Sequence, residues 1–241
     1  MGLQIGESFI PFHLFFEILA FYIGYRYYSK LRQNQTDHFN DSQRLSLILA
    51  AAIGALFGSR FLAALEHFQA LQTNFSWMLL TQSKTILGGL IGGWIAIEIT
   101  KKIYKIKKSS GDLFTFPIIL ALMIGRVGCA ATGVADSTAG IASNLPWAFN
   151  QGDGIPRHPT AIYEIIFLGL LWILLKKIPQ KYKLKNGDIF KIFMTSYASW
   201  RFLVEFIKPR EIIAINLSAI QIASLLVILY YTYNLTSKIR A

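Results

Sequence analysis

The sequence predicts an all-α fold: a polytopic membrane bundle of about seven transmembrane helices, forming one domain over residues 1–241. Three observations predict it. The chain is 54% hydrophobic and only 15% charged, whereas a soluble domain carries about 25% charged residues. The apolar residues form long runs, and a run of about 18 or more with few charges is typical of a membrane-spanning helix. The basic residues gather at one side of these runs.

Seven apolar runs define the predicted helices. In chain order they are Ile10–Tyr28, Leu45–Leu65, Thr85–Thr100, Leu113–Val134, Pro159–Leu175, Ile189–Ile207 and Ile215–Tyr233. The third run is short for a span, which leaves open whether Phe75–Lys84 belongs to it. The fifth is predicted to begin at Pro159, because proline is favoured in the first turn of a helix. No polar interval is long enough to bury a core of its own, so no soluble domain is predicted.

The distribution of positive charge predicts the orientation. Fifteen lysines and arginines follow runs one, three, five and seven, and only four lie at the opposite ends. Ten of these fifteen residues lie in two clusters, Lys101–Lys108 and Lys176–Lys185. By the positive-inside rule this places the N-terminus outside and the C-terminus in the cytoplasm. The net charge of +11 is therefore attributed to topology and to anionic membrane lipids. Nucleic acid is not a predicted partner, since no basic groove interleaved with aromatic residues is present.

Three arginines interrupt the apolar runs at a similar depth, in the outer parts of their predicted helices: Arg60, Arg126 and Arg201. A charge at such a depth costs at least about 2.5 kcal/mol on the lenient insertion scale. Glu205 lies four residues after Arg201, on the same face of a helix. Glu164 opens the fifth run. The pattern is compatible with a structural network of ion pairs and with a phosphate site, because arginine's planar fork matches phosphate oxygens.

The remaining polar residues suggest no metal cofactor. The histidines fall in different segments without a ligand spacing. The glycines of "LGGLIGGW" place Gly88 four residues before Gly92, and Gly89 four residues before Gly93, a spacing that lets membrane helices approach closely. "PRHPTAIYE" sets His158, Tyr163 and Glu164 at the outer mouth of the bundle.

Cys129 is the only cysteine of the chain and lies three residues after Arg126. Three interpretations remain open. It is a small packing residue, a weak hydrogen-bonding group, or a nucleophile whose pKa Arg126 lowers.

These motifs together resemble the bacterial prolipoprotein diacylglyceryl transferases. Four ordered blocks carry the resemblance: "FGSRF" (57–61), "GGLIG" (88–92), "GRVG" (125–128) with Gly133 downstream, and "RHPTAIYE" (157–164) with "YASWRFLVEFIKP" (197–209). The resemblance implies a seven-helix enzyme of the bacterial inner membrane. It implies transfer of diacylglyceryl from phosphatidylglycerol to the lipobox cysteine of a prolipoprotein, whose signal peptide is then a partner. No cofactor is implied.

The resemblance also implies the roles of particular residues. The implied catalytic residues are Arg126, Arg201, Tyr197, His158 and Glu164. Together with the residue patterns above, the resemblance leads us to predict as substrate-binding residues Arg60, Glu205, Gly88, Gly89, Gly125, Gly128, Tyr163, Gln221 and Cys129.

The chain also departs from the family pattern. Leu87 stands where the family has a histidine, Cys129 where it has an asparagine, and Thr132–Val134 where it has Asn-Gly-Glu. A tyrosine of the first helix corresponds to Phe15 in a loose alignment. These changes remove a candidate base and several polar groups. Two alternatives are therefore kept: a divergent paralogue that modifies another acceptor, and a non-catalytic phospholipid-binding membrane protein.

Overall fold

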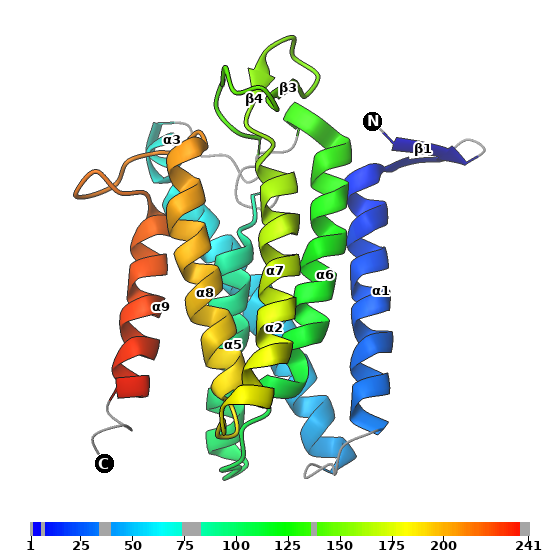
Figure 1. Ribbon diagram of the computed structural model, residues 1–241, viewed down its shortest axis with the longest axis vertical. Helices are drawn as coiled ribbons and strands as arrows, with labels where there is room; N and C mark the ends of the chain where they lie inside the picture. Colours follow the sequence, from blue (N-terminus) through cyan, green and yellow to red (C-terminus); the bar gives the residue numbers. More distant parts are fainter. Residues whose placement is uncertain (1, 6–7, 34–39, 74–82, 136–138, 237–241) are drawn as a thin grey trace. The chain divides into compact units, whose positions relative to one another are not determined.

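A computed structural model describes residues 2–5, 8–33, 40–73, 83–135 and 139–236 of the chain. Within these residues, each predicted run overlaps an α-helix, so the all-helical prediction is confirmed (Figure 1). The seven corresponding helices are α1 (Phe12–Gln33), α2 (Asp41–Glu66), α5 (Ile86–Ile103), α6 (Gly111–Thr132), α7 (Thr160–Lys181), α8 (Asp188–Val204) and α9 (Ala219–Thr236).

Several short elements were not predicted. They are α3 (Phe68–Thr73), the 3-10 turns η1 (Gly133–Ala135) and η2 (Glu205–Ile207), and two antiparallel hairpins. One hairpin pairs β1 (Gly2–Ile5) with β2 (Ser8–Pro11), with Gly2 opposite Pro11. The other pairs β3 (Phe149–Asn150) with β4 (Pro156–Arg157), with Phe149 opposite Arg157. The first hairpin leads into α1, and the second lies in the segment between α6 and α7.

Two helices begin a few residues later than predicted, where the backbone turns. The first helix begins at Phe12, not Ile10, because Ile10 and Pro11 pair in strand β2. The last begins at Ala219, not Ile215, because Ile215 adopts a positive φ of 54°, which a helix cannot accommodate. Thr85 caps α5 through its side-chain oxygen. The third helix therefore does not extend back over residues 83–84, and residues 74–82 lie outside the described part.

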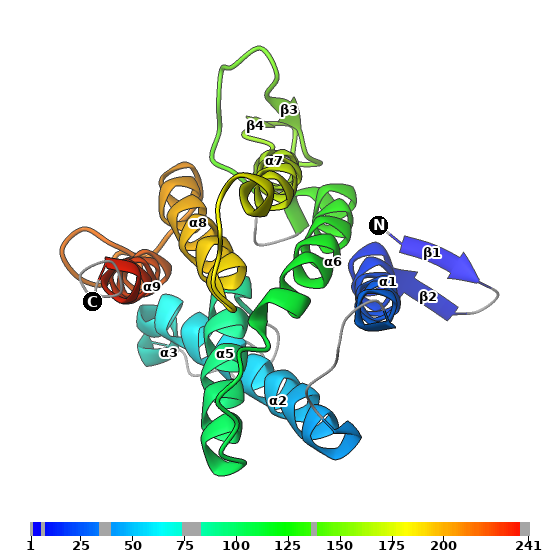
Figure 2. The same ribbon diagram turned by 60° about the horizontal axis from the view of Figure 1, so that its bottom comes forward.

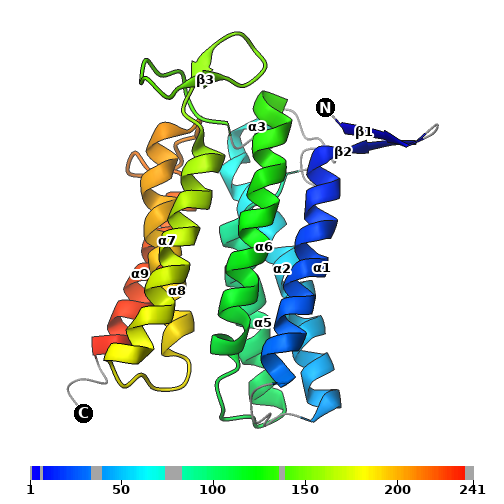
Figure 3. The ribbon, with the colours of Figure 1, turned by 45° about the vertical axis from the view of Figure 1, so that its right-hand side comes forward.

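The chain divides into two compact units, and α8 passes from the first into the second. The first unit contains α1, α6 and α7, of which α1 and α6 run antiparallel (Figure 3). Tyr28 stacks on Phe114 with ring centroids 4.6 Å apart. At the other end, a Cβ added to Gly128 would lie 2.7 Å from the Cβ of Phe16. This close approach brings the first turn of α1 beside the last turns of α6.

The second unit contains α2, α5 and α9, and α2 crosses α5 (Figure 2). Their contact is made by backbone, because Gly54 and Gly58 of α2 face Gly88 and Gly92 of α5. Such small-residue contacts are how membrane helices pack without a hydrophobic driving force. Trp94 of α5 packs on Tyr230 of α9, with ring centroids 5.0 Å apart.

The helices are apolar on the outside as well as the inside. Phe21 is 73% exposed, Phe57 69% and Leu170 64%. Two helices of the described residues, α2 and α6, are long and apolar enough to cross a membrane, with mean hydropathies of 1.9 and 2.0. Extensive exposed apolar surface is typical of a protein embedded in lipid.

Candidate active site

Arg126 of α6 and Glu164 of α7 form a buried ion pair in the first unit. The Nη2 atom of Arg126 lies 2.9 Å from Oε2 of Glu164. The two residues are only 3% and 2% exposed. A buried guanidinium is tolerated when a carboxylate compensates it, and removal of one partner is strongly destabilising. Glu164 therefore holds the charge of Arg126 in place and sets the direction of its guanidinium.

The other edge of this guanidinium faces sulfur. Nη1 of Arg126 lies 3.5 Å from Sγ of Cys129. On the far side of the sulfur, Nδ1 of His13 lies 4.0 Å away. His13 belongs to the first turn of α1, and its Nε2 lies 3.9 Å from Oε2 of Glu17, four residues further along that helix. A line of polar and ionisable groups thus runs from Glu17 through His13 and Cys129 to Arg126 and Glu164.

The segment before α7 covers this end of the unit. His158 Nδ1 lies 3.4 Å from the Tyr163 hydroxyl, which also accepts a hydrogen bond from Trp147 Nε1 at 2.6 Å. Gln151 Nε2 donates to the carbonyl oxygen of His158 at 3.0 Å. Pro159 is the N-cap of α7 and not its first residue, since Tyr163 N donates to the Pro159 carbonyl. These bonds fix His158 above the start of α7.

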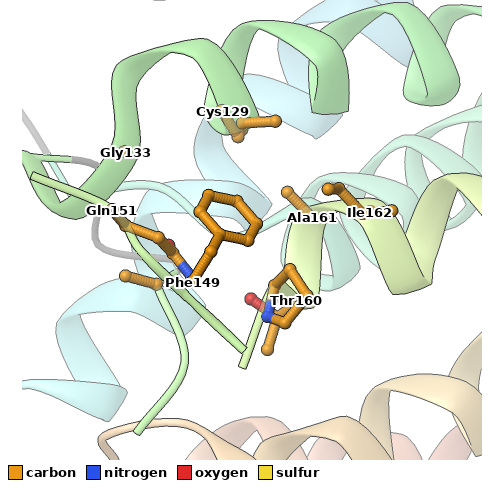
Figure 4. A pocket seen from close by; sticks show the side chains of 10 residues that line it. Cys129, Gly133, Phe149, Gln151, Thr160, Ala161 and Ile162 are labelled. Carbon is orange, nitrogen blue, oxygen red and sulfur yellow. The ribbon is translucent and has the colours of Figure 1, made fainter. Parts of the chain in front are cut away.

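A small pocket lies between the end of α6 and the start of α7. Its lining includes Cys129, Gly133, Phe149, Gln151 and Thr160. Figure 4 shows the Phe149 ring between the two helix ends, in the middle of the lining residues. Cys129 is buried and forms part of the wall of this pocket.

An exposed ion pair stabilises the loop itself. Arg157 Nε donates to Oδ2 of Asp153 at 2.8 Å, and its Nη1 donates to the Gly140 carbonyl at 3.2 Å. The hydrogen bond from Arg157 lowers the pKa of the Asp153 carboxyl. The Asp153 carboxyl therefore remains charged at neutral pH, and the pair closes the turn between β3 and β4.

The second unit holds another buried pair on α8. Nη2 of Arg201 lies 3.0 Å from Oε2 of Glu205, and the residues are 5% and 2% exposed. This is the contact that the i, i+4 spacing predicts. Tyr197, one turn before Arg201, is fully buried. The Arg60 side chain is partly exposed, and within the described part of the chain it forms no ion pair.

Gln221 caps the start of α9. Its Oε1 accepts from Arg210 Nη1 at 2.6 Å and from Ser218 N at 3.1 Å. Ser218 Oγ accepts in return from Gln221 N at 3.2 Å. This reciprocal arrangement is a capping box. Glu66, the last residue of α2, accepts from Ile220 N at 3.1 Å. The immediate contacts of Gln221 are thus structural.

The predicted site residues divide equally between the units. The first unit holds Arg126, Glu164, His158, Tyr163, Cys129, Gly125 and Gly128, and the second holds Arg201, Glu205, Tyr197, Arg60, Gly88, Gly89 and Gln221. Gly88 packs against Gly58 and Leu62 of α2, whereas a Cβ at Gly125 would meet no atom within 4 Å. The backbone at Gly125, next to Arg126, therefore has open space beside it.

Sequence reasoning missed His13, Glu17 and Arg210. The i, i+4 spacing of His13 and Glu17 was a usable signal, as was the Ser-x-x-Gln pattern from Ser218 for the cap of α9. Nothing in the sequence pointed to the approach of His13 to Cys129, which depends on how α1 packs on α6. Among the described residues, no group of three or more His, Cys, Asp or Glu side chains is arranged to hold a metal ion.

Comparison with known proteins gives one consistent family. The sequence profile of the prolipoprotein diacylglyceryl transferase family matches residues 3–236. The phosphatidylglycerol–prolipoprotein diacylglyceryl transferase of Dehalococcoides mccartyi is 27% identical over 193 residues, covering 78% of this chain and 74% of the relative. The enzyme of that name from Wolbachia sp. subsp. Brugia malayi is 27% identical over 220 residues, covering 86% and 81%. That of Clostridioides difficile is 35% identical over 143 residues, covering 58% and 55%.

Proposed function

Because this chain belongs to the prolipoprotein diacylglyceryl transferase family, we propose that it transfers the diacylglyceryl group of phosphatidylglycerol to the lipobox cysteine thiol of prolipoproteins. The observation that carries the proposal is the match to the family over residues 3–236, nearly the whole chain. Each unit contains a buried arginine paired with a glutamate, and a fixed guanidinium suits a reaction that builds negative charge on phosphate.

The reaction exchanges one bond for another at the glyceryl C3 carbon. The acceptor sulfur forms a bond to C3, the bond from C3 to the phosphate oxygen breaks, and glycerol 1-phosphate leaves. Negative charge grows on the phosphate as this bond breaks. Guanidinium groups fixed in a site of low dielectric stabilise such charge without reorganising.

Arg126 is suited to this task by its two contacts. Glu164 holds Nη2 and keeps the guanidinium oriented. Nη1 lies 3.5 Å from the sulfur of Cys129, and sulfur is a weak acceptor. A phosphate oxygen would therefore replace this contact at little cost. We assign Arg201 the same role, oriented by Glu205 and Tyr197, with Arg60 as a secondary cation and His158, Tyr163 and the glycines shaping the entrance.

The proposal is tested with purified protein in vesicles of phosphatidylglycerol and a synthetic lipobox peptide. The peptide is expected to gain the mass of one diacylglyceryl group, and an equal amount of glycerol 1-phosphate is expected in solution. Expression in a strain depleted of its own transferase should restore growth. If the protein binds the lipid without modifying the peptide, it is a lipid-binding protein instead.

We further propose that residues 1–241 form a single transmembrane domain of about seven helices in the bacterial inner membrane, with the N-terminus outside and the C-terminus in the cytoplasm. The charge asymmetry and the exposed apolar side chains support this topology. In a Cys129→Ser background, a cysteine at Ser143 should react with an impermeant maleimide added to intact cells, and a cysteine at Ser109 should react only after lysis. The reverse labelling pattern would overturn the orientation.

A further inference from the structure

The proposed reaction needs a group that accepts the proton of the acceptor thiol. The thiolate is the reactive form of cysteine, and an unperturbed thiol has a pKa of about 8.5. Most of it is therefore protonated at neutral pH. Histidine is the side chain best suited to accept the proton, because its ordinary pKa is about 6.5.

Of the four histidines, three are not suitably placed or lie outside the described residues. His67 pairs with Glu211 in the second unit at 3.3 Å. His158 contacts the Tyr163 hydroxyl. His38 lies outside the described part of the chain. His13 remains, and it is the histidine that approaches the Arg126 guanidinium, separated from it by a single sulfur atom.

The sulfur of Cys129 marks where a thiol can sit in this arrangement. It lies 3.5 Å from the guanidinium of Arg126 and 4.0 Å from the imidazole of His13. A substrate sulfur beside Cys129 would meet the same two groups, one able to take its proton and one able to stabilise negative charge. The His13 side chain is 36% exposed, so it is open to a substrate on its outer side.

The surroundings of His13 set its orientation. On its own helix, Glu17 lies 3.9 Å from Nε2 and places a carboxylate on that side of the ring. From α6, the sulfur of Cys129 faces Nδ1 at 4.0 Å and Arg126 lies on the other side of that sulfur, where Glu164 of α7 pairs with it. The strands β1 and β2, which also pack on α1, contain no titratable side chain. A carboxylate behind one ring nitrogen and the reacting group at the other is the usual arrangement of a histidine base.

We propose that His13 is the general base of the transfer reaction, accepting the proton of the acceptor thiol at Nδ1. The inference rests on the proposed function. The proton passes from the acceptor Sγ to Nδ1 as the bond from sulfur to C3 forms and the bond from C3 to the phosphate oxygen breaks. His13 then releases the proton to the leaving glycerol 1-phosphate or to water. The base of this chain would then lie on α1, and not at position 87, where leucine replaces the histidine of the family pattern.

The test is a pH profile of His13→Gln, a substitution that keeps a polar side chain and removes the base. Activity per folded molecule should fall about 10²–10⁴-fold at pH 6.5. The variant depends on thiolate formed in solution, so its rate should rise about tenfold per pH unit up to about pH 8.5. The loss of activity of the variant relative to the parent should therefore be smaller at pH 9 than at pH 6.5. An equal deficit at both pH values, or full activity at pH 6.5, would overturn the role of His13.

The control is His67→Gln, which removes an imidazole of the second unit and should leave the profile unchanged. The yield of monodisperse protein separates loss of folding from loss of catalysis. The parent protein separates the two proposals: a parent that modifies no lipobox peptide contradicts the proposed function, whereas an active parent with a pH-independent His13→Gln deficit contradicts only the base.

Discussion

Replacing Arg126 with lysine is expected to lower transferase activity per folded molecule by about 10²–10³-fold, nearly as far as replacing it with alanine. Lysine keeps the positive charge but loses the planar fork that binds two phosphate oxygens at once. Lysine also cannot reach Glu164 and a phosphate with the fixed geometry that Nη1 and Nη2 provide. The measurement is diacylglyceryl transfer from phosphatidylglycerol to a lipobox peptide.

Folding must be separated from catalysis in this experiment. Arg126→Ala removes the guanidinium that pairs with the buried Glu164, which is expected to destabilise the protein by about 3–5 kcal/mol. The double variant Arg126→Met with Glu164→Leu removes both charges, so it should recover folded protein and remain inactive. Arg157→Lys changes an exposed pair with Asp153 and serves as the matched control. Full specific activity in Arg126→Ala would end the proposal that this residue binds phosphate.

The helices could be predicted from the sequence because a membrane span is defined by a long apolar run. Their ends could not, since they depend on local backbone choices. The turn at Ile215 and Asn216, where both residues have positive φ, lies within apolar sequence and carries no glycine or proline. Strand β2 (Ser8–Pro11) likewise has the apolar character of the first run. Hydropathy does not distinguish these segments from helix.

The candidate site could be predicted only where its contacts are local. The pair of Arg201 and Glu205 follows from helical spacing alone. The pair of Arg126 and Glu164 joins two helices, and the sequence could name Glu164 only as one of two carboxylates available to three arginines. The approach of His13 to Cys129 depends on the register with which α1 packs on α6. The close contact of Phe16 with Gly128, which has no side chain, sets that register. No local pattern encodes that register.

Replacing Gly92 with alanine is expected to reduce strongly the yield of folded protein, although alanine favours helix over glycine by about 1 kcal/mol. A Cβ at this position would collide with the Gly54 carbonyl oxygen and lie 2.8 Å from the Cα of Gly58. Both are backbone atoms and cannot rotate away. The helices α2 and α5 would have to separate along the contact that joins them, with a cost of about 1–3 kcal/mol or more.

The matched control is Gly89→Ala, three residues earlier on the same helix. There the added Cβ would meet its nearest neighbour, the Ala55 carbonyl oxygen, at 3.6 Å, which is ordinary contact. The intrinsic preference of alanine for helix should then prevail, and this variant should be as stable as the parent or slightly more stable. Thermal unfolding in detergent, followed by size-exclusion chromatography, measures both. Equal stability of the two variants would mean that α2 and α5 do not pack backbone to backbone at Gly92, and that the "LGGLIGGW" glycines serve a purpose other than close approach.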